Sequence, residues 1–413
     1  MHTPAIHAST ASTHPDPTWY TAARFGLFIH WGLYALPAGA WEGREVDYIG
    51  EWLQHGERIP CARYAAFARD FQPSRFNALA WVRAAKDAGM RYVVFTAKHH
   101  DGFALYHSAV DPFNVVDATP WGRDPLAELA AACRAEGMRL GIYYSHCVDW
   151  REAHAGSADL KEAGRMWGND WEFPPGTADG FDEYLVRKAE PQLTELLSRY
   201  GDIALLWFDT PIATLTLAQA QRIHDLVRRL QPACLIGNRL GHGFGDIDGL
   251  GDNQAPRTPS RRPGEACVTL NETWGYKAHD HDWKNPAQVA GLLAACAAKD
   301  CNLLLNIGPQ ADGAFPAAAL EILASIGTWL RQHGAAIYGT RGSPLPADPP
   351  GCAVTHDATH VHVFALDSEI TEVVLNGCLP PLPPLFFDQT ADAFSPPSEP
   401  ATVRAATPRR PAA

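Results

Sequence analysis

The chain has 413 residues, of which 46% are hydrophobic and 19% are charged, so it can bury a large core and lacks the composition of a disordered protein. Its net charge of −12 disfavours nucleic acid as a partner, because an acidic surface repels phosphates. Nine cysteines are scattered without a Cys-X-X-Cys pair, which favours free thiols in a reducing compartment over a disulfide framework.

The first residues, MHTPAIHASTASTHPDPTWY, lack the basic start and the apolar stretch of a signal peptide. No other segment is apolar enough to span a membrane. We therefore expect a soluble, cytoplasmic protein with neither a membrane nor a nucleic-acid partner. The oligomeric state stays open.

Apolar runs that suit buried strands alternate with patterns that suit helices. The expected strands are residues 24–32, 91–100, 139–146, 202–209, 233–239, 267–271 and 301–309. The expected helices are residues 77–90, 124–138, 181–201, 217–232, 287–300 and 318–334, with an interruption at Pro191. Strands that are apolar on both faces indicate a parallel sheet covered by helices. Seven or so strands without a glycine-rich dinucleotide motif favour a (β/α)8-like TIM barrel over a doubly wound sheet.

The character of the sequence changes towards both ends. We expect a flexible N-terminus at residues 1–16, a catalytic barrel at 17–338, a partial β-rich C-terminal region at 339–388 and a disordered, Pro/Ala-rich tail at 389–413. The β-rich region is short enough to be only part of a β-sandwich.

Almost every expected strand ends in polar or aromatic residues that a buried strand does not need. They are His30-Trp31, Lys98-His99-His100-Asp101, Tyr143-Tyr144-Ser145, Trp207-Phe208-Asp209, Asn238-Arg239 and Asn306. Each residue alone has a structural explanation: His30 could be a satisfied core histidine, and Asp209 could cap the next turn. Because the carboxyl ends of parallel barrel strands lie on one face, their coincidence predicts a shared pocket there.

The residue types at this face favour a sugar as the ligand. Flat apolar faces are expected from Trp31, Trp41, Trp52, Trp207, Trp274 and Tyr144, and directional hydrogen bonds from His, Glu, Arg and Asn. A sugar ring matches both, because it has an apolar C–H face and a rim of hydroxyls. For tryptophans in helical patterns, such as Trp81 and Trp329, we expect core packing instead.

Cleavage of a glycosidic bond needs two carboxyl groups. Asp209 follows an apolar strand and is expected low in the pocket, ionised beside cationic or donor groups. The second carboxyl must protonate the leaving oxygen, and Glu265 and Glu272, which flank the strand at 267–271, are both candidates.

Several motifs in this order resemble glycoside hydrolase family 29, the α-L-fucosidases, over roughly residues 18–340. The motifs are RFGLFIHWGLYALPAGAWEG (24–43), EW (51–52), FTAKHHDGFALYHS (95–108), LGIYYSHCVDW (140–150), LLWFD (205–209), TLNETWGY (269–276) and NLLLNIGP (302–309). The resemblance implies an exo-acting, retaining α-L-fucosidase that needs no metal or other cofactor. Its partner would be a fucosylated glycan or a fucoside.

The resemblance also implies roles for individual residues. Asp209 matches the nucleophile. Positions that bind fucose or shape its pocket are matched by His30, Glu51, Trp52, His99, His100, Tyr144, Trp207, Arg239 and Trp274. Many members carry a Trp-Glu pair before the TLNETWGY stretch. That pair reads Gly264-Glu265 here, so Glu265 is the expected acid/base and Glu272 the second choice.

Three other functions stay open at this point. A metal-dependent barrel hydrolase could use His30, His99, His100, Asp101 and His146, although no HExxH spacing is present. A fucose-binding barrel with weak catalysis is a second alternative, because the tryptophan before Glu265 is missing. A retaining glycosidase for another sugar is the third. For fucose itself, Phe28, Trp207 and Trp274 are the expected niche for the C6 methyl group.

Overall fold

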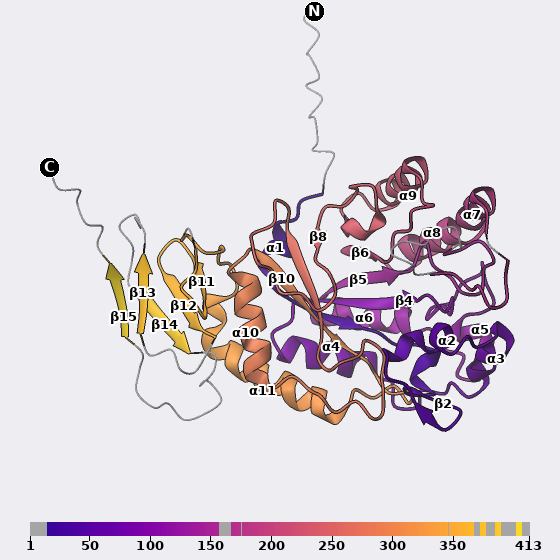
Figure 1. Cartoon of the computed structure of the whole chain (residues 1–413), viewed down its shortest axis with the longest axis horizontal. Helices are drawn as coiled ribbons and strands as arrows, with labels where there is room; N and C mark the ends of the chain where they lie inside the picture. Colours follow the sequence, from indigo (N-terminus) through magenta and orange to yellow (C-terminus); the bar gives the residue numbers. More distant parts are fainter. Residues whose placement is uncertain are drawn as a thin grey trace, which may run out of the picture.

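The computed structural model of the protein describes residues 15–156, 167–174, 176–345 and 347–366, and the backbone of three further strands. Figure 1 shows a large body of strands and helices that is followed by smaller sheets near the C-terminus. Most of the expected flexible N-terminus, residues 1–16, lies outside the described residues. In the described part of the chain, none of the helices combines the length and the apolar character that a bilayer span requires.

Eight parallel strands form the main sheet, in the order β7-β6-β5-β4-β1-β10-β9-β8. They are β1 (Phe25–Ile29), β4 (Tyr92–Lys98), β5 (Arg139–Tyr144), β6 (Leu205–Phe208), β7 (Leu235–Ile236), β8 (Asp248–Gly249), β9 (Gly264–Thr269) and β10 (Cys301–Ile307). A parallel bridge between Gly237 and Ile247 joins the two edges of the sheet, directly after β7 and directly before β8. The predicted (β/α)8-like barrel is thereby confirmed.

Two strands differ from the sequence prediction. β8 has only two residues, too few for a recognisable apolar run, and the sequence analysis did not predict it. β9 begins at Gly264, three residues before the expected strand, because Glu265 and Ala266 pair with β10 as well. This earlier start moves Glu265 from a loop into the barrel wall.

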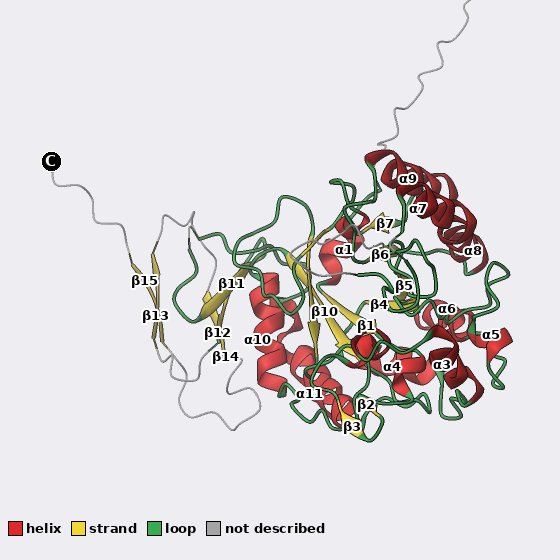
Figure 2. Ribbon diagram, turned by 45° about the vertical axis from the view of Figure 1, so that its right-hand side comes forward, coloured by secondary structure: helices red, strands yellow, loops and turns green. Residues whose placement is uncertain are grey.

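The helices on the outside of the barrel agree with the predicted ones (Figure 2). They are α4 (Ala78–Asp87), α6 (Pro125–Glu136), α7 (Ala178–Tyr184), α8 (Glu190–Arg199), α9 (Leu217–Leu230), α10 (Pro286–Ala297) and α11 (Ala317–His333). Side chains at the N-caps, namely Asn77, Asp124, Thr177, Thr216 and Asn285, accept backbone N–H groups of the first turns. Each such cap stabilises a helix by about 1 kcal/mol and sets its first residue.

At the expected interruption near Pro191, the helix changes its type and does not end. A π-helical turn, η4 (Leu185–Ala189), joins α7 to α8, and the Glu190 N–H donates to the carbonyl of Leu185. Proline has no N–H for the usual bond to the carbonyl four residues earlier, and its ring crowds that carbonyl. The wider turn accommodates Pro191 while the helix continues.

The stretch from β7 to β9 lacks a barrel helix. Its residues 237–263 are all described, and they contain only the 3-10 turn η5 (Asn238–Leu240) and the two-residue strand β8. Long loops on the carboxyl side of barrel strands are where binding and catalytic residues collect. We therefore expect this irregular segment to contribute residues to the predicted pocket.

The N-terminal helix α1 (Thr18–Ala23) covers the opposite end of the barrel. Tyr20 is fully buried there, and its carbonyl accepts a hydrogen bond of 2.8 Å from Asn302. Trp19 packs edge-on against Tyr92 at the start of β4. The end of the barrel away from the predicted pocket is thus closed by aromatic side chains.

The remaining elements lie in connections and near the C-terminus. Short elements between β1 and β5 and after α11 are η1 (Leu33–Ala35), β2 (Ala40–Trp41), β3 (Arg44–Glu45), η2 (Gly50–Trp52), α2 (Leu53–Gly56), α3 (Cys61–Ala65), η3 (Ala66–Arg69), α5 (Val115–Ala118) and η6 (Gly334–Ala336). Strands β11 (Cys352–His356), β12 (Val361–Ala365) and β14 (Leu385–Gln389) form one small sheet, and β13 (Glu372–Asn376) pairs with β15 (Thr402–Ala406).

These strands agree with a β-rich region after the barrel. β15 lies inside the tail that we expected to be disordered, and the rest of that tail after Gln389 lies outside the described residues. The domain limits at residues 338 and 388 stay predictions.

Two helix glycines test the packing of the outer layer. A Cβ added to Gly327 in α11 would stand 2.1 Å from the carbonyl oxygen of Asp87, whereas one on Gly291 in α10 would approach only Leu366, at 3.8 Å. We expect Gly327→Ala to lower the free energy of unfolding by about 1–3 kcal/mol, because α11 must move away from α4. Gly291→Ala should leave it unchanged or raise it by up to about 1 kcal/mol. Denaturant unfolding of both variants measures the difference, and equal stabilities would contradict this packing.

Candidate functional site

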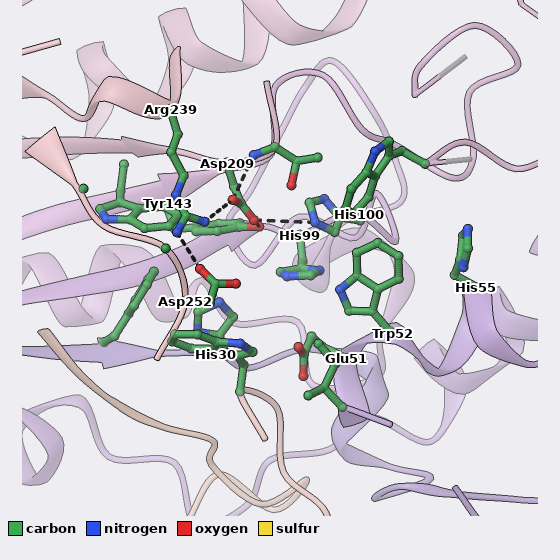
Figure 3. A pocket seen from close by; sticks show the side chains of 18 of the residues that line it. His30, Glu51, Trp52, His55, His99, His100, Tyr143, Asp209, Arg239 and Asp252 are labelled. Carbon is green, nitrogen blue, oxygen red and sulfur yellow. Dashed lines mark hydrogen bonds and ion pairs between the residues drawn. The ribbon is translucent and has the colours of Figure 1, made fainter. Parts of the chain in front are cut away.

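A cavity of about 820 Å³ opens at the carboxyl ends of the barrel strands. Figure 3 shows its polar side chains converging from several strands. Of the predicted site residues, those that line it are His30, Glu51, Trp52, His99, His100, Trp207, Asp209, Arg239 and Trp274. Residues that are up to 244 positions apart, from His30 to Trp274, therefore share one pocket, as expected for a parallel barrel.

Asp209 lies directly after β6, and both of its carboxylate oxygens are held. Oδ1 accepts 2.8 Å hydrogen bonds from Arg239 Nη1 and from the Thr210 N–H, and Oδ2 accepts one of 2.8 Å from the Tyr143 hydroxyl. Thr210 has a φ of 48°, a left-handed conformation that β-branched residues seldom adopt, and its N–H meets the carboxylate in that conformation. The carboxylate is thus fixed in one orientation.

The surroundings of Asp209 keep it ionised. Burial by itself would raise the pKa of this carboxyl, but the Arg239 guanidinium and the hydrogen bonds from Arg239 and Tyr143 outweigh burial and hold the pKa below its usual range. His100 Nε2 stands 3.6 Å from Asp209 Oδ2. A buried, oriented and charged carboxylate is what a nucleophile in this pocket requires.

A second carboxylate of the pocket, Asp252, follows β8 and was not predicted. Its Oδ1 accepts a 2.5 Å hydrogen bond from Arg239 Nη2, while Nη1 of the same guanidinium holds Asp209. The Asp252 side chain is 53% exposed, so it reaches towards the open side of the pocket. The signal that could have revealed it is its place in the long, glycine-rich loop before β9.

Glu265, the expected acid/base, does not line the pocket, so its expected place near Asp209 has to be corrected. It is 2% exposed inside the barrel wall, because β9 starts earlier than predicted. Its carboxylate is occupied by hydrogen bonds from Tyr20, Tyr92 and Trp207. Glu272, the second candidate, is an exposed loop residue that does not line the pocket either.

Tyr144 also differs from the prediction by one position. Successive side chains of a strand point to opposite sides, and in β5 it is Tyr143 that points into the pocket. Tyr144 points to the helices, where its hydroxyl donates to Gln192 at 2.7 Å. Trp31 and Trp41 are likewise absent from the pocket lining, and Trp31 packs in the core against Phe76.

His30 and His100 are neutral hydrogen-bond partners, because burial lowers the pKa of each to about 4. The amide of Asn306 donates to the carbonyl of Trp274, so its Oδ1 faces His30 Nδ1 at 2.7 Å and requires a proton there. Ser145 donates to a backbone carbonyl and accepts from His100 Nδ1 at 2.6 Å. Both rings therefore carry the proton on Nδ1 and keep the lone pair of Nε2 for a ligand hydroxyl.

His99 and His100 both line the pocket although they are adjacent in sequence. β4 ends at Lys98 after a register shift, so the two histidines lie in a turn rather than on a regular strand. His99 stacks on Tyr143, with ring planes 5° apart. The described residues contain no group of three or more His, Cys, Asp and Glu side chains arranged to hold a metal ion.

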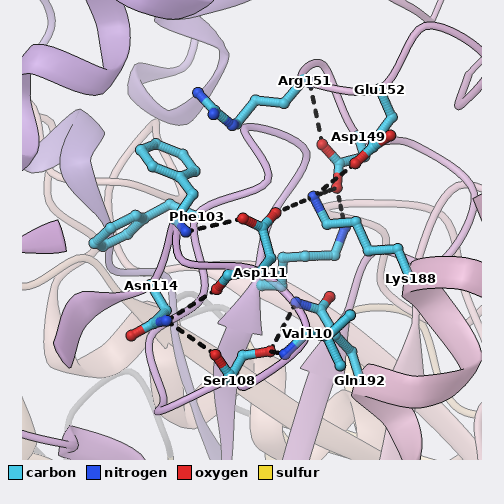
Figure 4. Close-up of polar contacts among 12 residues, drawn as sticks. Phe103, Ser108, Val110, Asp111, Asn114, Asp149, Arg151, Glu152, Lys188 and Gln192 are labelled. Atoms are coloured by element: carbon cyan, nitrogen blue, oxygen red, sulfur yellow. Dashed lines mark hydrogen bonds and ion pairs between the residues drawn. The ribbon is translucent and has the colours of Figure 1, made fainter. Parts of the chain in front are cut away.

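A buried ion network of Lys98, Lys188 and Asp149 supports this turn, and Figure 4 shows Lys188 and Asp149 within it. Lys98 and Lys188 both contact Asp149 Oδ2, at 3.1 and 2.9 Å, and all three side chains are at most 1% exposed. Burial would raise the pKa of Asp149, but the two ammonium groups hold it well below its usual range. Trp150, the next residue, donates its backbone N–H to the carbonyl of His100. The π-helical turn that contains Lys188 thus helps to fix the histidine turn.

Glu51 is the third carboxyl of the pocket. It lies in η2, is 1% exposed and accepts a 2.8 Å hydrogen bond from the Gly275 N–H. Its neighbour Gly50 donates to Thr273, so the two sequence-distant motifs EW and TWGY form one wall. Burial raises the pKa of Glu51 from its ordinary 4.5 to about 7, against the effect of the backbone hydrogen bonds.

Comparison with known proteins gives a consistent match. A family model described as alpha-L-fucosidase matches residues 3–335. The chain is 28% identical over 370 residues to an alpha-L-fucosidase of Branchiostoma floridae, covering 85% of this chain and 79% of the relative. It is 28% identical over 356 residues to the tissue alpha-L-fucosidase of Bos taurus, covering 80% of this chain and 70% of the relative.

Solved structures agree. The alpha-L-fucosidase AlfC from Lactobacillus casei, in complex with alpha-L-fucose, is 42% identical with a TM-score of 0.71, covering 77% of this chain and 98% of that chain. Alpha-L-fucosidase isoenzyme 1 from Paenibacillus thiaminolyticus is 36% identical with a TM-score of 0.73, covering 83% of this chain and 81% of that chain.

The pKa of Glu51 gives a prediction for stability. Between pH 4.5 and about 7 the folded state binds more protons at Glu51 than the unfolded state does, so the free energy of unfolding falls as pH rises through this range. Glu51→Gln removes this loss. We expect it to be more stable than the parent chain at pH 8, by up to about 3 kcal/mol, and similar at pH 4.

Denaturant unfolding at both pH values measures the difference between the two proteins. Glu272→Gln, at an exposed loop carboxyl, is the matched control and should follow the parent chain. If the stability of Glu51→Gln relative to the parent did not change with pH, the raised pKa of Glu51 would be contradicted.

Proposed function

Because the chain belongs to the α-L-fucosidase family and is a glycoside hydrolase, we propose that it releases terminal α-L-fucosyl groups by a retaining double displacement. The observation that carries the proposal is the shared guanidinium of Arg239, which contacts Asp209 through Nη1 and Asp252 through Nη2. Retaining enzymes need two carboxyl groups that lie about 5–5.5 Å apart, one to attack and one to transfer protons. Two carboxylates bound to one guanidinium support such a pair.

In the first step, an Asp209 oxygen attacks the anomeric carbon and forms a covalent fucosyl ester. The bond from that carbon to the leaving oxygen breaks. The proton that Asp252 carries in its acid form passes to the leaving oxygen, and Asp252 becomes the carboxylate that Arg239 holds. In the second step, Asp252 takes a proton from water, the water oxygen attacks the anomeric carbon, and Asp209 leaves as a carboxylate. The nucleophile and the acid/base return to their starting states.

The rest of the pocket supports fucose as the sugar. Nε2 of His30 and Nε2 of His100 can accept hydroxyl protons, and a neutral imidazole does so without attracting an anion. Phe28, Trp207 and Trp274 line the cavity as neighbouring rings, with Phe28 5.0 Å from Trp207 and 6.0 Å from Trp274 between centroids. This apolar corner is our proposed niche for the C6 methyl group of fucose.

The leaving group has room in the same cavity. A volume of about 820 Å³ is within the range of pockets that hold drug-sized ligands and exceeds the need of a single sugar ring. Variants of AlfC have been solved with 4-nitrophenyl α-L-fucopyranoside and with Fucα(1,6)GlcNAc. We propose that this chain takes fucosides of both kinds, an aryl fucoside and a fucosylated glycan. Its cytoplasmic location stays a prediction.

The nucleophile is tested by Asp209→Ala. We expect the release of 4-nitrophenol from 4-nitrophenyl α-L-fucoside to fall by more than about a thousandfold, because the ester cannot form. Azide should restore part of the rate by entering the vacated space, and the product should be β-L-fucosyl azide, identified by NMR. Near-normal turnover of the variant would exclude Asp209 as the nucleophile. Unchanged rates of the parent chain in EDTA would separate this mechanism from the metal-dependent alternative.

The acid/base is tested by Asp252→Asn, with Glu272→Gln as the matched control. The introduced amide would keep an oxygen for Arg239 but has no acidic proton to donate, so a fucosylated glycan should be slowed far more than the 4-nitrophenyl substrate. With the activated substrate and azide, the product should be α-L-fucosyl azide. Equal slowing of both substrates would argue against Asp252, and slowing in the control would point to Glu272.

A further inference from the structure

Glu265 is a buried carboxyl that the proposed mechanism does not use. Oε2 accepts hydrogen bonds from the hydroxyls of Tyr20 and Tyr92, at 2.6 and 2.9 Å, and Oε1 accepts one of 2.7 Å from Trp207 Nε1. Among the described residues, no Lys, Arg or His side chain forms an ion pair with Glu265 within 4.0 Å. A buried carboxyl without a cationic partner lowers stability relative to an apolar residue. Its presence under the pocket therefore indicates a role at the site.

Trp207 is the only one of these three partners that lines the pocket. The indole N–H of Trp207 can only donate a hydrogen bond, and Glu265 Oε1 is its acceptor. Because the side chain is only 5% exposed, the position of this oxygen sets the tilt of the indole ring.

Both side chains that hold Asp209 rest on this indole. The Tyr143 ring is stacked on it, with centroids 5.4 Å apart and planes 19° apart, and the Arg239 guanidinium carbon lies 4.7 Å from the ring centroid. Tyr143 holds Asp209 Oδ2 and Arg239 holds Oδ1, each at 2.8 Å. A change in the tilt of Trp207 would therefore shift both contacts of the carboxylate at once.

We propose that Glu265 is a positioning residue: it fixes the Trp207 indole, and through Tyr143 and Arg239 it fixes the reactive carboxylate of Asp209. The other two hydrogen bonds come from Tyr20 in α1 and from Tyr92 at the start of β4, and either of them alone can hold Oε2 in place. The inference rests on the proposed function, in which Asp209 is the nucleophile. Glu265 transfers no proton in it.

The test combines Glu265→Met with Trp207→Phe, using the full chain and 4-nitrophenyl α-L-fucoside. Methionine keeps the volume but removes the acceptor, so kcat should fall about ten- to hundredfold, the scale of a misplaced reacting group. Phenylalanine keeps an aromatic face but removes the donor. Each single change deletes the same hydrogen bond, so the double variant should lose no more than the worse single variant.

Two further variants separate positioning from folding. Glu265→Gln keeps an oxygen acceptor for Trp207 and should retain kcat within a few-fold of the parent. Tyr20→Phe removes a hydrogen bond on the side of Glu265 away from the pocket, so it should lower the melting temperature as Glu265→Met does but leave kcat unchanged. A loss of kcat in Tyr20→Phe that matches Glu265→Met would overturn the proposal, since it would reflect stability alone.

The remaining outcomes concern the role of Glu265 itself. As a positioning residue, Glu265→Met slows the aryl fucoside and a fucosylated glycan equally, and azide restores neither. Selective loss of the glycan with azide rescue, full kcat in Glu265→Met, or multiplicative losses in the double variant would each overturn the proposal. Failure of the proposed function is distinct, because it appears as turnover in Asp209→Ala, whatever the coupling between Glu265 and Trp207.

Discussion

The contact of one guanidinium with two carboxylates is the interaction on which the site depends. Arg239 lies in the short turn η5, Asp209 at the end of β6 and Asp252 after β8, so the contact draws together the least regular part of the barrel. The positive charge keeps Asp209 ionised in a buried place where burial alone would favour its neutral form. Without Arg239 the two carboxylates would repel each other, and Asp209, the proposed nucleophile, would lose the cation that keeps it ionised.

Part of the hydrogen bonding that the pocket offers to a ligand comes from neutral side chains. Burial keeps His30 and His100 uncharged, and their partners Asn306 and Ser145 decide which ring nitrogen is free. Neutral acceptors and aromatic rings can contact a hydroxylated ring without competing for Arg239. The charges that stabilise the histidine turn, on Lys98, Lys188 and Asp149, lie behind it and are buried, so they support the site without entering it.

The barrel was predictable because its signal is local and repeated. Long apolar strands and amphipathic helices have lengths and periods that a sequence reveals, and seven strands were found in this way. β8 has only two residues, Asp248 and Gly249, and could not be found, since only its pairing with β9 makes it a strand. The early start of β9 was hidden for a similar reason: Glu265 is polar, and only its pairing with β10 makes it part of a strand.

The sequence alone determined the barrel, the face that carries the pocket, and most of the residues that line it, including Asp209, Arg239 and His30. These follow from residues placed at strand ends, and all strand ends of a parallel barrel share one face. Only the tertiary structure placed Tyr143 rather than Tyr144, and Asp252 rather than Glu265, in the lining of the pocket. Which side of a strand faces the pocket depends on register, and a one-residue difference reverses it. Which carboxyl meets Asp209 depends on how a long loop folds over Arg239, a contact that no local pattern encodes.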